Sequence, residues 1–195
     1  MNKFFVLLAF AVLSVTLGTV TCRLRFSRCP RVPAVRNVNM TELSGTWYEI
    51  EKFDLTFERL FRRCNILHLS QPKNQTSFPH LNAIKLGSDG NKFFSITGTL
   101  SQTRSRNGDM VMKFKRKSDL FAWRFHYKLV DHDSVAHQYA VFYGCSPSFG
   151  SEYLWVYSRK KFLAFDTLDD ISRRLRKMGV NMNSGLTVTD QTNCD

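Results

Sequence analysis

The sequence predicts an all-β fold, an antiparallel barrel or sandwich followed by a single helix. About eight strand-like runs follow one another between residues 45 and 158. Several of these runs alternate between apolar and polar residues, which is typical of strands with one buried face. Turn-forming residues, and not helical patterns, separate the runs, as at 87–90, 106–109 and 146–150. Only one amphipathic helical stretch follows, near residue 170.

The first 22 residues have the pattern of a secretory signal peptide. Lys3 supplies a basic start, residues 4–17 are apolar, and 18–21 are small. The apolar run is shorter than the roughly 20 residues that a membrane-spanning helix needs. We therefore expect residues 1–22 to be removed and 23–195 to form one secreted, extracellular domain.

The chain is basic, with 28 Lys and Arg residues against 16 Asp and Glu residues and a net charge of +12. Removing the leader takes away Lys3 and no acid, which leaves +11. A charge of this size favours anionic partners, such as membrane surfaces or polyanions. No nucleic-acid-binding motif occurs, and a secreted protein does not meet nucleic acid in the cell.

Five cysteines are present, an odd number for a secreted protein. Cys22 lies at the predicted cleavage junction, so four cysteines remain for two disulfides. Those four allow three pairings, and spacing alone does not choose among them. They are Cys29, Cys64, Cys145 and Cys194.

Before the strands, residues 23–38 form a basic arm with prolines, and 39–44 suggest a short turn of helix. The clearest strand runs from Trp123 to Leu129, where odd positions are large and apolar and even positions are polar or charged. The stretch 110–115 repeats this pattern, and Tyr153, Trp155 and Tyr157 share one face of a later run.

The predicted helix begins at a capping box formed by Thr167 and Asp170. Its apolar stripe, which should pack against the strands, consists of Leu168, Ile171, Leu175 and Met178. Gly179 provides a stop, because glycine adopts the left-handed conformation that ends many helices.

Three features together resemble the lipocalin family. Gly45 and Trp47 open the first strand as Gly-x-Trp, Arg159 follows the last strand, and the chain ends in Thr-Val-Thr-Asp-Gln-Thr-Asn-Cys over 187–194. The tail is similar to the branch of apolipoprotein D and the insect bilin-binding proteins. The resemblance covers essentially the whole mature chain. It implies an eight-stranded antiparallel up-and-down β-barrel with one C-terminal helix packed on the outside.

The resemblance also implies two disulfides, Cys29–Cys145 and Cys64–Cys194, and closure of one barrel end by Arg159 stacked on Trp47. One family element is missing. Where fuller family members carry Thr-Asp-Tyr, this chain reads Asp133-Ser134-Val135-Ala136. Any partner recognition carried by that loop therefore cannot be transferred.

An eight-stranded barrel can be filled by side chains or can hold one small ligand. Alternation alone does not separate a packed core from a cavity, whereas the resemblance favours a ligand such as a lipid, fatty acid, sterol, retinoid or bile pigment. Beyond such a bound lipid or bilin we expect no cofactor. The candidate lining residues are Met110, Met112, Phe114, Trp123, Phe125, Tyr127, Phe142, Trp155 and Tyr157, with Phe94 and Ile96 as weaker additions.

Other chemistry has less support in the sequence. No catalytic or metal-binding motif occurs, so we expect no enzyme and no metal site. Five histidines raise the alternative of a haem-handling lipocalin: His68, His80, His126, His132 and His137. Two sequons make Asn39 and Asn74 candidate glycosylation sites.

A second alternative is an interaction protein that binds polyanions or membranes through its basic exterior, with the barrel as a scaffold. Lys160-Lys161 and the basic residues of the helix motivate it. We also expect the loop after the first strand to contact anionic lipid at the open end of the barrel. The residues of that loop are Phe57, Arg59, Leu60, Phe61, Arg62 and Arg63.

Overall fold

The strands close into an antiparallel barrel, shown by a computed structural model that describes residues 29–53, 62–73, 77–86, 93–103, 107–114, 123–146, 151–182 and 186–194. The barrel strands are β1 (Gly45–Lys52), β2 (Arg63–Leu69), β3 (Ser77–Leu86), β4 (Phe93–Gln102), β5 (Asp109–Phe114), β6 (Trp123–His132), β7 (Tyr139–Ser146) and β8 (Ser151–Ser158). Each pairs with its neighbour in sequence, and β1 pairs with both β8 and β2, which closes the ring. The predicted eight-stranded up-and-down barrel is therefore confirmed.

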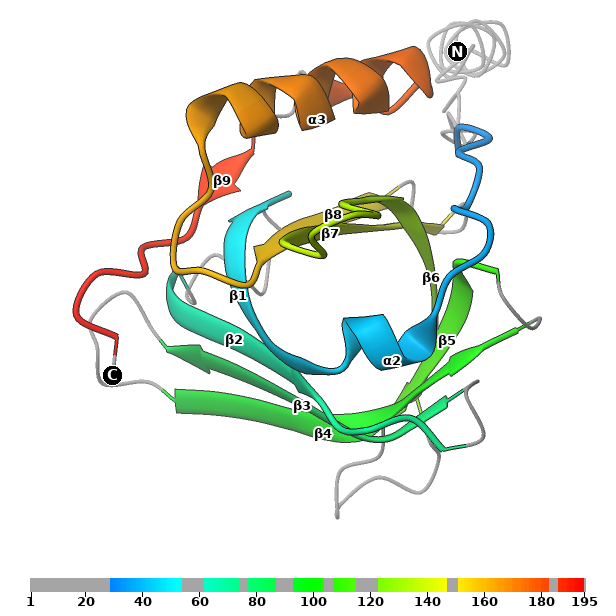
Figure 1. The fold of residues 1–195 in the computed structure, drawn as a ribbon, viewed down its shortest axis with the longest axis vertical. Coiled ribbons are helices and arrows are strands. Elements are labelled where there is room, and N and C mark those ends of the chain that lie inside the picture. The colour runs from blue at the N-terminus through cyan, green and yellow to red at the C-terminus, as the bar shows by residue number, and fades with distance from the viewer. Residues whose placement is uncertain are drawn as a thin grey trace, which may run out of the picture.

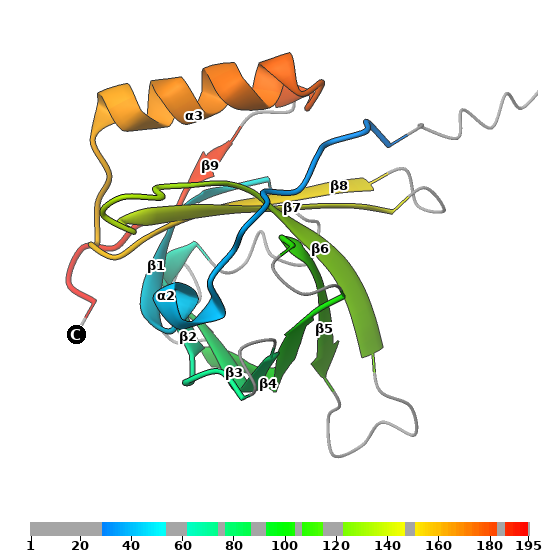
Figure 2. The same cartoon turned by 45° about the vertical axis from the view of Figure 1, so that its right-hand side comes forward.

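A short helix lies across one end of the barrel. This helix, α2 (Met40–Leu43), directly precedes β1, and its residues Met40 and Leu43 are buried in the barrel core. Figures 1 and 2 show α2 at the end of the barrel where β1 begins. We call this the closed end and the opposite end the mouth.

Two apolar clusters hold the described part of the fold together. The first fills the barrel interior, and its members Trp47, Leu129 and Phe142 come from three different strands. The second lies between the outer faces of β6–β8 and the long helix, where Val141 and Val156 are fully buried. Because β7 and β8 are covered on both faces, their buried residues form continuous runs and do not alternate.

The long helix α3 (Phe165–Lys177) packs outside the barrel on β7 and β8, as Figure 1 shows. Ile171 and Leu175 are its buried residues, in agreement with the predicted stripe. The predicted capping box is wrong, because the helix begins at Phe165 with Ala164 as its N-cap and no side chain caps it. Backbone geometry and packing therefore set this end, and Thr167 lies inside the first turn.

The C-terminal end of α3 is a Schellman motif. Gly179 has a φ of +85° and donates to the carbonyl of Arg176, while the amide of Val180 donates to the carbonyl of Leu175. The predicted glycine stop is confirmed. Among the described helices, none is long and apolar enough to span a membrane.

Two disulfides tie the chain ends to the barrel. Cys29 bonds to Cys145 of β7, and Cys64 of β2 bonds to Cys194, the pairing that the resemblance implies. The tail, residues 186–194, adds a two-residue strand that the alternation did not predict, β9 (Thr187–Val188), which pairs with β1. The leader with Cys22, the sequon at Asn74 and most of the loop after β1 lie outside the described residues.

Candidate functional site

Arg159 and Trp47 seal the closed end together with α2. The Arg159 guanidinium carbon lies 3.6 Å from the centre of the Trp47 ring. The last carbonyl groups of a helix have no partner within the helix. Here Arg159 donates to the Glu42 carbonyl at 2.7 Å and the Trp47 indole to the Leu43 carbonyl at 2.8 Å. Arg159, Trp47 and α2 thus form a plug that blocks the barrel end and gives the last two carbonyls of α2 hydrogen-bond partners.

The chain geometry at Gly45 explains why a glycine precedes Trp47. Gly45 has a φ of +96°, and a Cβ atom there would lie 3.2 Å from a guanidinium nitrogen of Arg159. A larger residue would be strained in this conformation and would crowd the guanidinium. Partial burial lowers the pKa of Arg159.

The candidate lining residues of β5–β8 face one another across the sheet. Cross-strand register pairs Met110 with Tyr127 and Met112 with Phe125, and it pairs Phe142 with Trp155. Paired residues in a sheet project from the same face. Most members of this set belong to the interior cluster or pack against it. Sequence alternation therefore found the inward face of these strands.

Exposure of these inward residues changes from one end of the barrel to the other. Near the closed end Met110, Leu129 and Phe142 are buried, with Leu129 fully inaccessible. Toward the mouth, Met112 and Phe125 remain partly exposed although a closed barrel surrounds them. The closed-end half is therefore a packed core, whereas inward residues nearer the mouth are less completely covered.

The partly exposed surface in the mouth half is aromatic. Tyr127 stacks on Phe125 with ring centres 6.2 Å apart and meets Trp155 edge-on at 5.3 Å. Tyr153 stacks on Trp155 at 6.3 Å. Such surfaces suit apolar ring systems or chains, and tyrosine adds a hydroxyl that can hydrogen-bond. Tyr153 shares the face of Trp155, although the predicted lining set does not include it.

Other members of the predicted lining occupy different places. Tyr157 lies near the closed end, where it meets Phe142 edge-on at 6.0 Å and is buried. Ile96 pairs with Ala83, which packs against the interior cluster. The side chains of Phe94, Phe114 and Trp123 lie outside the described part of the structure. A role in ligand binding stays a prediction for the whole set.

A polar cluster that the sequence pattern did not predict is buried beside this aromatic surface. Glu49 and Lys52 of β1 are fully inaccessible to solvent, and the Lys52 ammonium lies 3.2 Å from a carboxylate oxygen of Glu49. The Glu49 carboxylate also accepts from the Asn65 amide at 2.6 Å and from the Thr189 hydroxyl at 2.8 Å. A buried charge is tolerated when it is paired and hydrogen-bonded, as here. In the β1–β8 register, Lys52 stands opposite Trp155.

The tail completes the barrel wall where β1 and β2 separate. The register that pairs these strands ends at Tyr48 and Ile66. Beyond that point, the side-chain amide nitrogen of Gln191 donates to the main-chain carbonyls of Glu49 and Asn65, at 2.8 and 2.9 Å. One tail side chain thus bridges the two strands through their main chains.

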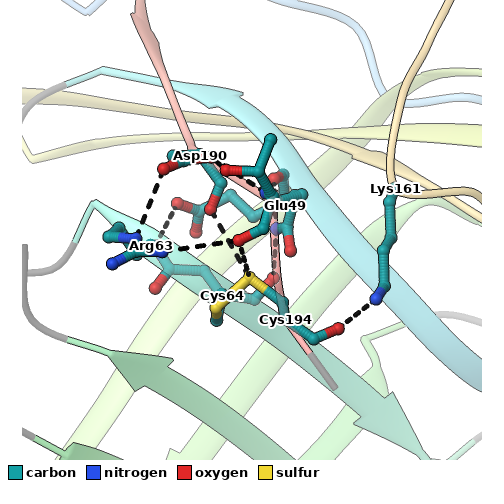
Figure 3. The surroundings of a disulfide bond; sticks show 9 residues. Glu49, Arg63, Cys64, Lys161, Asp190 and Cys194 are labelled. Carbon is teal, nitrogen blue, oxygen red and sulfur yellow. Dashed lines mark hydrogen bonds and ion pairs between the residues drawn. A yellow bond between two sulfur atoms is a disulfide. The ribbon is translucent and has the colours of Figure 1, made fainter. Parts of the chain in front are cut away.

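Further contacts hold the tail on the side of β2. The amide of Cys64 donates to the Asp190 carbonyl at 2.9 Å, and Asp190 lies 3.3 Å from Arg63. Figure 3 shows these groups around the Cys64–Cys194 disulfide, with Lys161 reaching the Cys194 carbonyl from the other side. Bonds from the Thr192 hydroxyl and amide lower the pKa of Asp190.

A hollow of about 350 Å³ lies between the N-terminal arm and the wall of β5–β7. Its lining includes Met110 and Tyr127 together with His126, Lys128 and the Cys29–Cys145 disulfide. The polar outer-face residues make this hollow less suited to an apolar ligand than the aromatic interior is.

The chain is similar to proteins of known identity over more than four fifths of their length. Apolipoprotein D of Macaca fascicularis is 26% identical over 179 residues, which cover 87% of this chain and 86% of that protein. Apolipoprotein D of Mus musculus is 24% identical, with coverages of 86% and 84%. Insecticyanin from the tobacco hornworm Manduca sexta superposes with a TM-score of 0.69 at 20% identity, covering 86% of this chain and 88% of that one. The chain is a lipocalin.

A third solved structure resembles this lipocalin at the level of the fold. The amine-binding protein of Rhodnius prolixus, in its tryptamine complex, gives a TM-score of 0.64 at 20% identity and covers 83% of this chain and 85% of that one. No protein-family model matches the chain.

The histidines whose side chains the structure describes do not gather around the barrel interior. His68 and His126 are exposed, and His68 contacts the hydroxyl of Thr46 at 3.2 Å. His132 and His137 lie near α2 at the closed end, where His137 is 3.7 Å from Glu42. Within the described residues, no group of three His, Cys, Asp or Glu side chains could hold a metal ion. The side chain of His80 lies outside that part.

The first sequon of the lipocalin overlaps a helix cap. Asn39 is exposed and caps α2, with its oxygen accepting from the Thr41 amide at 3.0 Å and its nitrogen donating to Glu42 at 2.9 Å. A glycan on that nitrogen would compete with the bond to Glu42. Glycosylation at Asn39 stays a prediction.

Proposed function

We propose that this lipocalin binds and carries a small apolar ligand in the mouth half of its barrel. The observation that carries the proposal is the partly exposed aromatic surface of Phe125, Tyr127 and Tyr153 inside a closed barrel. Leaving apolar surface uncovered costs about 25 cal/mol per Å², so a ligand that covers it gains that free energy. We further propose that the protein is secreted and works as a carrier, not an enzyme.

The relatives support an apolar or aromatic ligand class without choosing its identity. Apolipoprotein D is named as a lipoprotein component, and the Rhodnius prolixus protein binds an amine with an aromatic ring. In this chain the tyrosine hydroxyls of the mouth half could orient one polar group of a ligand. A lipid, fatty acid, sterol, retinoid or bile pigment would each satisfy this description.

The first experiment is a titration of the mature protein with the neutral apolar dye phenyl-naphthylamine. We expect saturation at one site, with quenching of tryptophan emission because Trp155 contacts Tyr127 and Tyr153. Native mass spectrometry and an absorption spectrum of protein from its own source would then identify the natural ligand. A visible band would indicate pigment or haem, and a lipid mass a lipid carrier.

Two substitutions on the same face of β6 separate the site from the core. Phe125→Ala should raise the dye Kd about tenfold and cost less than about 1 kcal/mol of unfolding free energy, because Phe125 borders open space. Leu129→Ala should cost about 2–5 kcal/mol, because Leu129 is fully packed, and should leave the dye Kd unchanged in the folded protein. The reverse pattern, or the lack of any saturable site, would mean that the interior is a packed core.

A further inference from the structure

Exposed apolar side chains gather at the closed end of the barrel. Among the described residues, four large apolar side chains are mostly exposed, and three of these belong to closed-end connections. Val135, in the turn between β6 and β7, is 88% exposed. Phe162, between β8 and α3, is 67% exposed, and Phe165, the first residue of α3, is 81% exposed. Figure 2 shows both connections at the end of the barrel that α2 closes.

The segment that carries the two phenylalanines is firmly held. The amide of Arg159 donates to the Gln138 carbonyl at 2.8 Å, which joins the β8–α3 connection to the β6–β7 turn. The buried Ser158 hydroxyl bonds to the Phe162 carbonyl at 3.2 Å, and Leu163 packs into the helix-facing cluster. The same short segment thus buries one apolar side chain and presents two others to solvent. Exposure of Phe162 and Phe165 is therefore a property of the fold.

Basic groups stand beside these rings. Lys160 is exposed, and its ammonium lies 6.0 Å from the centre of the Phe162 ring. Lys161 is also exposed, although its ammonium donates to the Cys194 carbonyl. Two acids stand close to these lysines: Asp166 lies in the first turn of α3, and the Asp133 carboxylate accepts from the Val135 amide at 3.0 Å. The local charge is therefore close to balanced, and attraction to an anionic surface comes mainly from the basic excess of the whole chain. The whole chain, at +12, is attracted to anionic surfaces.

We propose that Val135, Lys160, Phe162 and Phe165 form a docking surface for anionic phospholipid, which we call the closed-end patch. Aromatic rings and lysines are the side chains that favour the boundary between acyl chains and headgroups. The rings would enter the boundary, while Lys160 would stay at the level of the phosphates. Contact through this patch places the mouth on the side away from the lipid.

This orientation is the opposite of that expected from the loop after β1. Most of that loop lies outside the described residues, but one of its basic members, Arg63, is already bound to Asp190 and to the Thr192 carbonyl of the tail. Docking by the closed end leaves the mouth open for ligand exchange while the protein is held on a surface.

The test is co-sedimentation of the mature protein with vesicles of phosphatidylcholine and phosphatidylserine. Phe162→Ser/Phe165→Ser should lower the partition coefficient about tenfold at both low and high salt, because the loss is one of apolar burial. Lys160→Ser should lower it about fivefold at low salt and much less at high salt. The matched control is Val188→Ser, since Val188 is 65% exposed on β9, away from the patch, and its removal should have no effect.

Three results would overturn the proposal. The first is a lack of vesicle binding by the wild-type protein, and the second is equal binding by the double phenylalanine variant. The third is an equal loss from Val188→Ser, which would indicate general adhesiveness. Immobilised heparin provides a further arm: a tenfold loss there from the phenylalanine variant, without one on vesicles, would identify a polyanion as the partner instead. Unchanged dye binding by each variant would show that the barrel remains folded.

Discussion

At the scale of single residues, Arg159 does more than stack on an indole. Its two terminal nitrogens bond to the carbonyls of Thr46 and Glu42, so one side chain joins the start of β1, the end of α2 and the end of β8. These contacts link groups that are more than a hundred residues apart in sequence. The planar, forked shape of guanidinium makes this combination available to arginine and not to lysine.

We therefore expect Arg159→Lys to destabilise the protein by about 1–3 kcal/mol, since lysine keeps the charge but loses the stacking and at least one hydrogen bond. Urea unfolding followed by tryptophan emission would measure the loss. Arg173→Lys is the control, because Arg173 is exposed and its ion pairs on α3 should contribute little. If both variants unfold at the same urea concentration, the plug does not stabilise the barrel.

His132 makes the closed end sensitive to pH. Burial lowers its pKa from the ordinary 6.5 and outweighs the nearby Asp131, Glu42 and Asp133, which favour the charged form; His137 opposes that form. The unfolded chain therefore takes up a proton at a higher pH than the folded one. The contribution of neutral His132 to the free energy of unfolding is fully present above pH 6.5. It is lost as the pH falls from 6.5 through the pKa that His132 has in the folded protein.

His132→Gln should flatten this decline, because glutamine carries no charge in either state. The measurement is the free energy of unfolding at about pH 7.5 and about pH 5.5, compared with that of His126→Gln, whose side chain is exposed. Parallel declines in the two variants and the wild type would assign the pH dependence to other groups.

At the scale of elements, the tail is a piece of barrel wall. Gln191 bridges the strands that have separated, and the Cys64–Cys194 disulfide holds it there across 130 residues of sequence. A cross-link over a loop of that length stabilises by about 4–5 kcal/mol in the chain-entropy estimate.

Cys64→Ser/Cys194→Ser should lower the unfolding free energy by up to about 4–5 kcal/mol. It should also speed amide hydrogen exchange at Thr189 and Asp190, whose amides bond to the main chain of β1 and to Arg62. Cys29→Ser/Cys145→Ser removes a cross-link of similar length, 116 residues, but should leave the tail amides protected. Loss of tail protection in both variants would mean that the tail has no local attachment of its own.

How well the sequence predicted each element depended on what covered it. Alternation was clear in β6, whose outer residues Arg124 and His126 face solvent. It was blurred in β7 and β8, since α3 covers their outer faces. The start of α3 was placed too late, because Ala164 caps it without a side-chain bond and so leaves no residue signature. A strand of two residues, β9, is too short for any periodic pattern.

At the scale of the whole molecule, the sequence could give the inward face of the barrel but not the depth of each residue along its axis. Met110 and Met112 have the same parity, yet only Met110 is packed against the closed end. Depth depends on the plug, which is assembled from distant segments. A signal for the buried charge did exist, because Glu49 shares the parity of the buried Trp47. Its partners in β2 and the tail could not be read from local pattern.

The place of the tail in the wall has a consequence for the order of events during synthesis. β1 is among the first structured segments to be made, yet its partners β8 and β9 follow about a hundred residues later. Until the final residues emerge, β1 and β2 are left with unpaired edges of the kind that other chains can join. A nascent chain of this lipocalin therefore depends on its own last residues for protection, and a copy that stops short of Gln191 would carry a permanent gap beside the proposed ligand site.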